Sequence, residues 1–195
     1  MSHLKIAIIG AGNVGSALQR GLTRAGHDVR VVKRDPKAIG DVASWSEVIF
    51  LAVPFKAIES TATAIADKAD GKPVVDVTNA IDDQYRLVIG FSTSGAEELQ
   101  RKLPGARIVK AFNTVFAQHM HDGRLGSQAL AAFVAGDDSA AKATVIRLGS
   151  DIGFQSVDAG PLQIARLLEP LGYLNIQLGY MMKMGTDIGV TLARA

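Results

Sequence analysis

Residues 5–15 read KIAIIGAGNVG, and this stretch decides the fold. The run from Lys5 to Ile9 is almost wholly apolar, as expected of a strand that is buried on both faces. Gly10 ends the run, and the apolar residues from Val14 to Ala25 then follow helical spacing. The sequence therefore predicts a strand, a tight turn and a helix in this order.

The turn carries the pattern G-x-G-x-x-G, with Asn13 and Val14 between the last two glycines. Between a strand and a helix this pattern is a dinucleotide-binding fingerprint. Gly10 permits the tight turn, Gly12 lets the backbone approach a pyrophosphate, and Gly15 lets helix and strand pack closely. The helix N-terminus would supply amide groups and partial positive charge to the phosphates. An ordinary glycine-rich turn is the alternative, and the flanking strand and helix argue against it.

Short apolar strands and helices alternate along most of the chain. Further strands are expected at 28–32, 48–53, 73–77, 107–111, 129–135 and 154–158, and helices at 58–69, 94–103, 138–148 and beyond Pro161. Ser94 and Asp138 are expected to cap the helices that they begin. Right-handed crossovers between such strands produce a doubly wound, mostly parallel Rossmann sheet of the α/β class. We expect residues 1–160 to form the nucleotide-binding domain and residues 161–195 a C-terminal helical extension that is not an independent domain.

The residues at the end of the second strand predict which dinucleotide binds. An NAD enzyme usually has an acidic residue there, about twenty residues beyond the glycine loop, to bond the ribose 2′-OH. This chain has Lys33 and Arg34, which can pair with a 2′-phosphate and so favour NADP(H). Asp35 leaves the opposite interpretation open, because a register one residue later would place an acid near the ribose.

Three other strand ends carry candidate binding residues. Ligands of open α/β sheets bind beyond the carboxyl ends of the strands. Val53 and Pro54 end the third strand, Asn79 follows the fourth, and the fifth ends in Ala111 with Asn113 just beyond it, so these residues should line the nicotinamide. Asn79 and Asn113 are equally well explained as turn residues that bond their own backbone.

Composition excludes several classes of function. Net charge is +2 and Lys and Arg are scattered, which argues against a nucleic-acid partner. The chain has no cysteine, which excludes disulfides and thiolate sites and fits a reducing compartment, so we expect a cytoplasmic location. The most apolar stretch, residues 162–182, carries Arg166, Glu169 and Pro170, so no membrane insertion is expected. His119 and His121 are two residues apart, so a helix would not place both on one side, and no carboxylate cluster accompanies them; no metal site is expected.

With these residues placed, the chain resembles the F420-dependent NADP reductase family, which includes deazaflavin:NADP oxidoreductases and the cytosolic reductase domains of membrane ferric reductases. The likeness covers nearly the whole chain. It rests on 9–15, 33–36 and 53–55, and more specifically on VKAFNT at 109–114, AGDD at 135–138, DAGPL at 158–162 and LEPL at 168–171.

The resemblance implies hydride transfer between NADPH and a small redox acceptor such as F420, FMN or FAD. The chain departs from the pattern of archaeal deazaflavin-specific members, which have Ser in place of Lys33 and His in place of Asn113. Because the cofactor carries the chemistry, no catalytic triad is expected and no catalytic residue is assigned. Two alternatives remain: an NADP(H)-binding redox sensor or reductase subunit without turnover of its own, and a small imine or hydroxyacid reductase.

The last helix predicts a homodimer. Leu167, Leu171, Leu174, Leu178 and Met181 recur at steps of three and four residues, which places them on one helix face. A single parent sheet offers little cover for that face and for the other apolar residues of the helix. Dimer formation would bury them and could bring a second chain beside the nicotinamide. The alternative is that the helix packs across its own domain.

Overall fold

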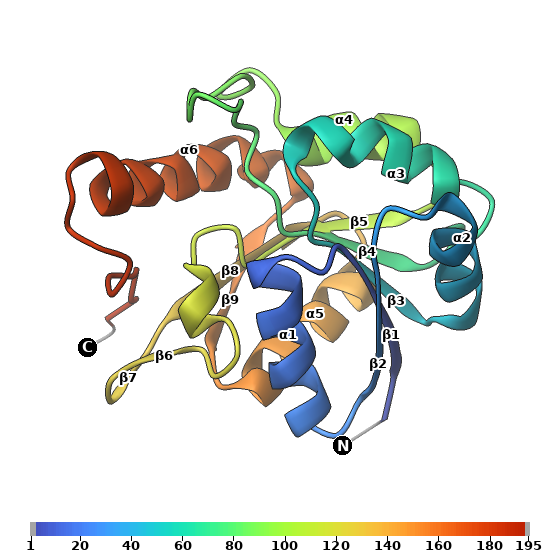
Figure 1. Ribbon diagram of the computed structural model, residues 1–195, viewed down its shortest axis with the longest axis horizontal. Coiled ribbons are helices and arrows are strands. Elements are labelled where there is room, and N and C mark those ends of the chain that lie inside the picture. Colours follow the sequence, from blue (N-terminus) through green and yellow to red (C-terminus); the bar gives the residue numbers. More distant parts are fainter. Residues whose placement is uncertain (1–2, 194–195) are drawn as a thin grey trace.

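A computed structural model describes residues 3–193, which form one mostly parallel sheet between two layers of helices (Figure 1). The sheet has seven strands in the order β2-β1-β3-β4-β5-β8-β9. Only the pair β5 and β8 is antiparallel among the neighbouring strands of this sheet. The predicted Rossmann class is therefore confirmed. The strands are β1 (Lys5–Ile9), β2 (Asp28–Val32), β3 (Val48–Leu51), β4 (Pro73–Asp76), β5 (Arg107–Lys110), β8 (Ala131–Gly136) and β9 (Gln155–Gly160).

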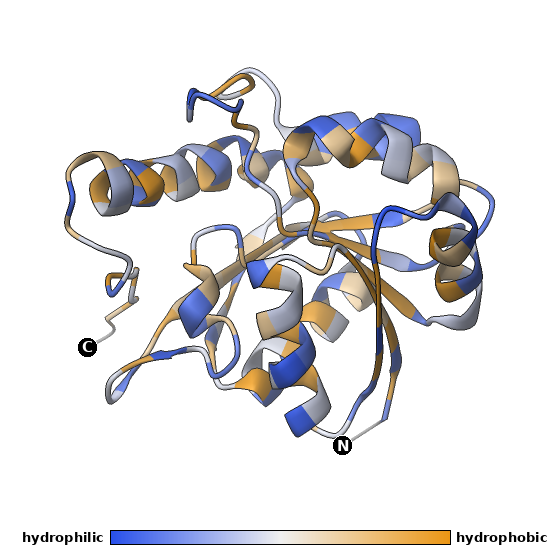
Figure 2. Cartoon of the chain, in the orientation of Figure 1, coloured by the Kyte–Doolittle hydropathy of each residue, from blue (hydrophilic) through white to orange (hydrophobic). Residues whose placement is uncertain are grey.

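The helices divide the core into two halves. α1 (Asn13–Arg24) and α5 (Ser139–Ile152) cover one face of the sheet, where Leu18, Leu22 and Leu148 are fully buried. α2 (Pro36–Trp45), α3 (Ile58–Ile65) and α4 (Gly95–Lys102) cover the other face (Figure 1). The strands between them are predominantly hydrophobic (Figure 2), as expected of a sheet with both faces covered. A small hairpin, β6 (Arg124–Leu125) with β7 (Gln128–Ala129), lies outside this sheet.

Helix capping accounts for several boundaries. The carboxylate of Asp138 and the hydroxyl of Ser94 accept hydrogen bonds from backbone amides at the starts of α5 and α4, which confirms both predicted N-caps. α2 was not predicted from the sequence. Asp35 caps it and Pro36 opens it, which are strong start signals, but its apolar stripe is too short to show a clear period. Several predicted strands extend one or two residues too far, since the last apolar residues belong to the loops beyond.

The C-terminal helix packs on the rest of the chain through its small and polar side. It comprises α6 (Ala165–Ile176) and a π-helical turn, Gln177–Met181. The buried residues of α6 are Ala165, Leu168, Glu169, Gly172 and Asn175, whereas the leucine series lies on the opposite side, where Leu167 and Leu174 are exposed. No helix within residues 3–193 is both long and apolar enough to cross a membrane.

A buried ion cluster joins this helix to the sheet. Lys110, at the end of β5, is fully buried and its ammonium group contacts carboxylates of Asp76 and Glu169, each at 2.9 Å. Its third hydrogen bond goes to the carbonyl of Thr78 at 2.6 Å. Burial opposes the charged form of Lys110, but the neighbouring carboxylates outweigh it and raise the pKa of Lys110. Lys110 thus stays charged, and its contribution to stability is lost only as the pH rises through that raised pKa.

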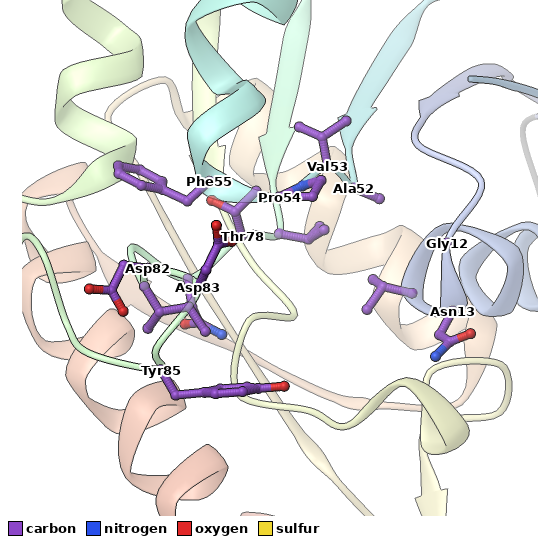
Figure 3. Close-up of a pocket in the computed structure, with 14 residues that line it drawn as sticks. Gly12, Asn13, Ala52, Val53, Pro54, Phe55, Thr78, Asp82, Asp83 and Tyr85 are labelled. Carbon is purple, nitrogen blue, oxygen red and sulfur yellow. The ribbon is translucent and has the colours of Figure 1, made fainter. Parts of the chain in front are cut away.

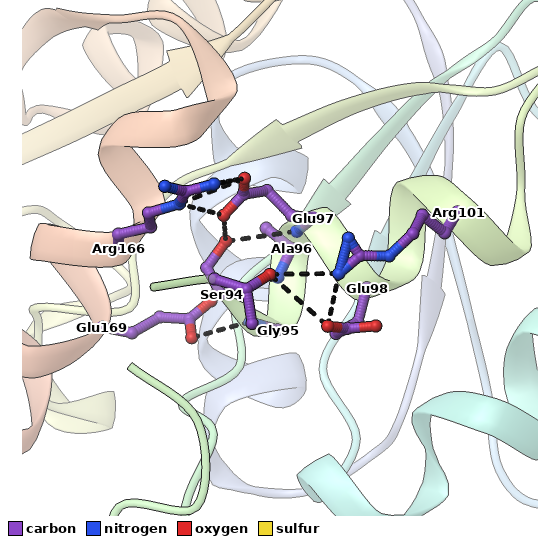
Figure 4. A network of polar contacts seen from close by, with 9 residues as sticks. Ser94, Gly95, Ala96, Glu97, Glu98, Arg101, Arg166 and Glu169 are labelled. Atoms are coloured by element: carbon purple, nitrogen blue, oxygen red, sulfur yellow. Dashed lines mark hydrogen bonds and ion pairs between the residues drawn. The ribbon is translucent and has the colours of Figure 1, made fainter. Parts of the chain in front are cut away.

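The N-terminus of α4 completes the cluster (Figure 4). The backbone amides of Gly95 and Ala96 donate to the carboxylate of Glu169 at 2.9 and 3.2 Å, so helix amides offset the surplus negative charge. One turn earlier on α6, the guanidinium of Arg166 donates two hydrogen bonds to the carboxylate of Glu97, from Nε at 2.9 Å and from Nη2 at 2.7 Å. Hydrogen bonding by Arg166 holds the pKa of Glu97 below its usual value. α6 is therefore fixed to α4 and to the ends of β4 and β5 by charged contacts.

Removing the buried cation should destabilise the protein strongly. Lys110→Met leaves two carboxylates buried side by side, a change that costs about 3–5 kcal/mol of unfolding free energy. Urea denaturation followed by the fluorescence of Trp45 measures it. Lys102→Met is the matched control, because Lys102 pairs with Glu59 at the surface, and its denaturation midpoint should match that of the wild type. Equal midpoints for both variants would contradict the assigned role of Lys110.

Candidate functional site

Cavities follow one another along the carboxyl ends of the parallel strands. One of about 560 Å³ runs from the end of β2 past β1 to β3. Another of about 490 Å³ continues from β1 and β3 to the loop beyond β4. Both are lined by Gly12, Ala52, Val53 and Pro54, so they form one continuous track across the sheet. Open α/β sheets bind their ligands at this edge.

The glycine loop has the geometry that its sequence requires. Gly10 has φ +114°, and a Cβ there would lie 2.1 Å from the carbonyl oxygen of Ala52. A Cβ on Gly15 would lie 1.9 Å from the carbonyl oxygen of Gly10. The tight turn at Gly10 and the close packing of helix and strand at Gly15 are therefore as predicted. Gly15 itself is buried and borders neither part of the track.

Gly12 differs from its neighbours, because a Cβ at this position would meet nothing within 4 Å and would project into open space. Gly12 is the N-cap of α1, and no side chain caps the helix. Asn13 and Val14 follow it at the edge of the track. The amides at this helix N-terminus are uncapped, and Gly12 has no side chain to cover them, so they fit an anionic group such as a pyrophosphate.

Lys33 and Arg34 lie at the β2 end of the track, with Pro36 and Ile39 beside them. Both cations are exposed, as expected for side chains that bind a charged group at the mouth of a cavity. Asp35 is engaged elsewhere, since its carboxylate accepts a hydrogen bond at 3.0 Å from the backbone amide of Lys37 and caps α2. The geometry thus favours a phosphate over a ribose hydroxyl as the partner at this end.

The middle of the track is apolar, and polar side chains join the apolar ones at its far end (Figure 3). Val53 and Pro54 line both parts of the track, and Phe55 follows them. Thr78 and Asn79, just beyond β4, line the far part. The hydroxyl of Thr78 is buried and has no hydrogen-bond partner among residues 3–193. A buried hydroxyl without a partner is costly, and a ligand with a polar group would satisfy it.

Asn79 and Asn113 bond each other rather than their own backbones. The amide of Asn113 donates to the Asn79 side chain at 2.9 Å, and that of Asn79 donates to the Asn113 carbonyl at 2.9 Å. Both line a smaller adjoining cavity of about 220 Å³ beside α6. The side-chain oxygen of Asn113 is buried and unpaired within the described residues. A Cβ on Gly172 would lie 2.5 Å from the side-chain oxygen of Asn79, so α6 packs directly on this pair.

Ala111 lies apart from the other candidate residues. It is fully buried in the core beneath α5 and borders none of these three cavities. Sequence reasoning placed it at the site because it stands at the end of a predicted strand. In the structure the chain turns at Phe112, whose φ is +64°, so Asn113 rather than Ala111 reaches the smaller adjoining cavity.

Sequence reasoning missed one part of the site. Thr78 adjoins Asn79 at the strand end where ligand contacts were expected, and it lines the far part of the track. Ile81, Asp82, Asp83 and Tyr85 also line the track. They belong to an irregular segment with no periodicity, and only Asp82-Asp83 hinted at a turn. They form a wall of the far part of the track, and the Tyr85 ring lies across it from Val53 and Pro54 (Figure 3).

A glycine loop at a helix N-terminus, cations beyond β2 and a track across the strand ends together define a dinucleotide-binding Rossmann protein. Comparison with known proteins agrees. The family model described as NADP oxidoreductase, coenzyme F420-dependent, matches residues 5–44 and 40–80. A solved structure from Arthrobacter sp. FB24, provisionally named an F420-dependent NADP-reductase, is 31% identical with a TM-score of 0.89, covering 98% of this chain and 100% of that one.

Two further relatives are similar. Hypothetical protein SMa0349 from Sinorhizobium meliloti is 32% identical with a TM-score of 0.70, covering 85% of this chain and 88% of that one. Metalloreductase STEAP3 from Rattus norvegicus is 32% identical over 181 residues, which is 86% of this chain. The chain spans 36% of the length of that metalloreductase. The protein belongs to the family of F420-dependent NADP oxidoreductases, and by that membership it is an NADP-dependent oxidoreductase.

Substitution of the glycines should separate binding from folding. In Gly12→Val the new side chain enters open space, so the melting temperature should be unchanged, while NADPH affinity should fall at least about 100-fold, or ~2.7 kcal/mol. Gly15→Val is the matched control, since its side chain would overlap the Gly10 carbonyl and should unfold the protein. NADPH fluorescence titration and thermal melting test both. A folded Gly12→Val protein with unchanged affinity would refute the phosphate loop.

Proposed function

We propose that the protein transfers hydride between NADPH and a flavin or deazaflavin acceptor. The observation that carries this proposal is the continuous track from Lys33 to Asn79. NADPH has a 2′-phosphate and a pyrophosphate, and the sites proposed for these two groups determine the direction in which the nucleotide lies along the track. The 2′-phosphate is bound by Lys33 and Arg34 beyond β2, and the pyrophosphate by the amides that follow Gly12. The nicotinamide then reaches the far part of the track, beyond β3 and β4.

The residues at the far end suit a nicotinamide ring. Val53 and Pro54 provide an apolar surface for the ring. The buried oxygens of Thr78, in the track, and of Asn113, in the adjoining cavity of about 220 Å³, have no partners within residues 3–193. A carboxamide has both a donor and an acceptor, so it can satisfy such groups. Asn79 and Asn113 hold each other in place, which keeps this end rigid for close stacking.

NADPH supplies the hydride, and a flavin or deazaflavin ring takes it up with its two electrons, a proton following from solvent where the acceptor requires one. The chain itself needs no strong acid or base for this step. Its residues bind the nucleotide, orient the ring and exclude water from the contact between donor and acceptor. A flavin or deazaflavin is proposed as the acceptor because the family of this chain is described as coenzyme F420-dependent.

Steady-state oxidation of NADPH tests the proposal. FMN, FAD and F420 are each offered with NADPH or NADH, and NADPH should have the higher kcat/KM. A charge-assisted hydrogen bond contributes about 1.5–3 kcal/mol, so Arg34→Ala should shrink the preference for NADPH by roughly 10-fold or more. Lys37→Ala is the control, because Lys37 is a neighbouring exposed cation that does not line the track.

Two outcomes would contradict these assignments. Equal kcat/KM for NADH and NADPH with the wild type would show that Lys33 and Arg34 do not bind a 2′-phosphate. Tight NADPH binding without multiple turnover on any flavin or F420 would instead favour a redox sensor or a reductase subunit.

We also propose that the protein is a homodimer and that residues 161–195 serve as its dimerisation extension. The outward side of α6 and the turn after it carry large exposed side chains, with 60% of Leu167 and 53% of Leu174 accessible. Tyr180, Met181, Met182 and Met184 continue the exposed surface. An apolar surface of this kind is typical of a contact between proteins, and a second copy would bury it.

A charge on the exposed leucine face should produce a folded monomer. Leu174→Glu places a carboxylate in the proposed interface, where burial without a partner costs several kcal/mol, so the dimer should dissociate. Leu168→Glu is the matched control, since Leu168 is buried against the same domain and the variant should unfold. Sedimentation velocity and circular dichroism distinguish the two variants. A wild type that sediments as a monomer at every accessible concentration would disprove the dimer.

A further inference from the structure

The far part of the track is bordered by a turn that belongs to none of the strands and helices described above. Residues 81–87, here called the 81–87 turn, leave the end of β4 and fold back on themselves through a bridge between Ile81 and Leu87. Ile81, Asp82, Asp83 and Tyr85 of this turn line the cavity of about 490 Å³. In Figure 3 the ring of Tyr85 lies across the cavity from Val53 and Pro54, with Gly12 and Asn13 toward one end.

Asp82 fixes the shape of this turn. One of its carboxylate oxygens accepts hydrogen bonds at 2.9 Å from the backbone amides of Gln84 and Arg86, and the other accepts from the Arg86 guanidinium at 2.8 Å. Hydrogen bonding to the Arg86 amide holds the pKa of Asp82 below its usual value. These hydrogen bonds hold the turn in one defined conformation.

Tyr85 is held in an unfavourable backbone conformation within that turn. Its φ is +57°, in the left-handed region that glycine or asparagine occupies more easily than a bulky aromatic residue. Such a conformation is energetically unfavourable and is concentrated at functional sites. The side chain that this strained backbone carries lines the cavity. Tyr85 remains 43% accessible there, so its ring is free to contact a ligand.

Residues at the C-terminal end of the last helix contact Tyr85. The ring of Tyr180 lies 6.0 Å from that of Tyr85, and the ring of Phe116 packs edge-on against Tyr180 at 5.6 Å. The side-chain amide of Gln177 donates to the Tyr85 carbonyl at 3.4 Å. Gln177 and Tyr180 both belong to the π-helical turn after α6, and such turns are frequent at functional sites.

We propose that Tyr85 is the stacking surface for the flat ring of the hydride acceptor, and that Tyr180 positions it. This inference rests on the proposed function, in which the nicotinamide lies against Val53, Pro54 and Thr78. A planar acceptor then fills the space between that nicotinamide and the Tyr85 ring, stacked on both. Offset stacking on an aromatic ring favours flat conjugated molecules over globular ones, so Tyr85 would select the flavin and deazaflavin class.

Equilibrium dialysis of FMN and of F420 against the NADP⁺-saturated protein tests this directly, without depending on turnover. Tyr85→Leu keeps an apolar side chain but removes the aromatic ring, and it should weaken binding of FMN or F420 about tenfold. Tyr85→Phe keeps the ring and should stay within about twofold of the wild type. Tyr180→Ala should weaken acceptor binding by a smaller factor. NADP⁺ affinity should be unchanged in all three variants.

Phe91→Ala is the matched control for Tyr85. Phe91 follows the same turn, has φ +63° and is 71% exposed, but it does not line the track. The Phe91→Ala protein should bind FMN and F420 as tightly as the wild type does. If the wild type binds an acceptor and Tyr85→Leu binds it equally well, the role of Tyr85 is refuted while the proposed function stands. If the NADP⁺-saturated wild type binds neither FMN nor F420, the acceptor class itself is wrong and the inference falls with it.

Discussion

A lysine buried among carboxylates determines how the C-terminal helix meets the sheet. Lys110 could not remain charged in the core without Asp76 and Glu169, and Glu169 would be equally costly without Lys110 and the amides that begin α4. β4, β5, α4 and α6 therefore have one mutual arrangement in which every charge is satisfied. An apolar contact at the same place would tolerate sliding or rotation of α6, whereas hydrogen-bonded ions do not.

The fixed orientation of α6 matters because that helix contributes to the site. Gly172 lies against the Asn79 and Asn113 pair, where a larger residue would push the loops apart. Further along, Gln177 and Tyr180 contact the 81–87 turn. The track thus has two parts of different origin. The glycine loop and the ends of β1, β2 and β3 form one part, and the far part depends on a turn in the middle of the chain and on the C-terminal helix. Loops on a rigid scaffold commonly carry specificity in this way.

The sequence predicted the parts of the site whose cause is local. A buried strand, a glycine turn and an amphipathic helix each follow from a few adjacent residues, so β1, the Gly10–Gly15 loop and α1 were placed correctly, as was the capping by Ser94. The ion cluster depends on residues far apart: Asp76 and Lys110 are separated by 34 positions, and Glu169 lies on another element. A hint was present in two strands: β4 ends in Asp76 and β5 ends in Lys110, so two apolar strands end in charges of opposite sign. The register of the sheet pairs these two residues. Tyr85 gave no comparable hint, because its carbonyl meets a helix 92 residues away.

The cluster and the cavity meet at Thr78. Its carbonyl accepts from Lys110 at 2.6 Å and its amide donates to Asp76 at 2.9 Å, so both backbone groups of Thr78 are bound by the charges beneath it. The side-chain hydroxyl, buried and without a partner within residues 3–193, is the one polar group of this residue left for the cavity. The bound backbone holds the residue in place, and the buried, unpaired hydroxyl carries an energetic cost that a polar ligand in the cavity would relieve. The same ions that fasten α6 to the sheet thereby fix the position of a hydrogen-bonding group that faces the proposed nicotinamide site.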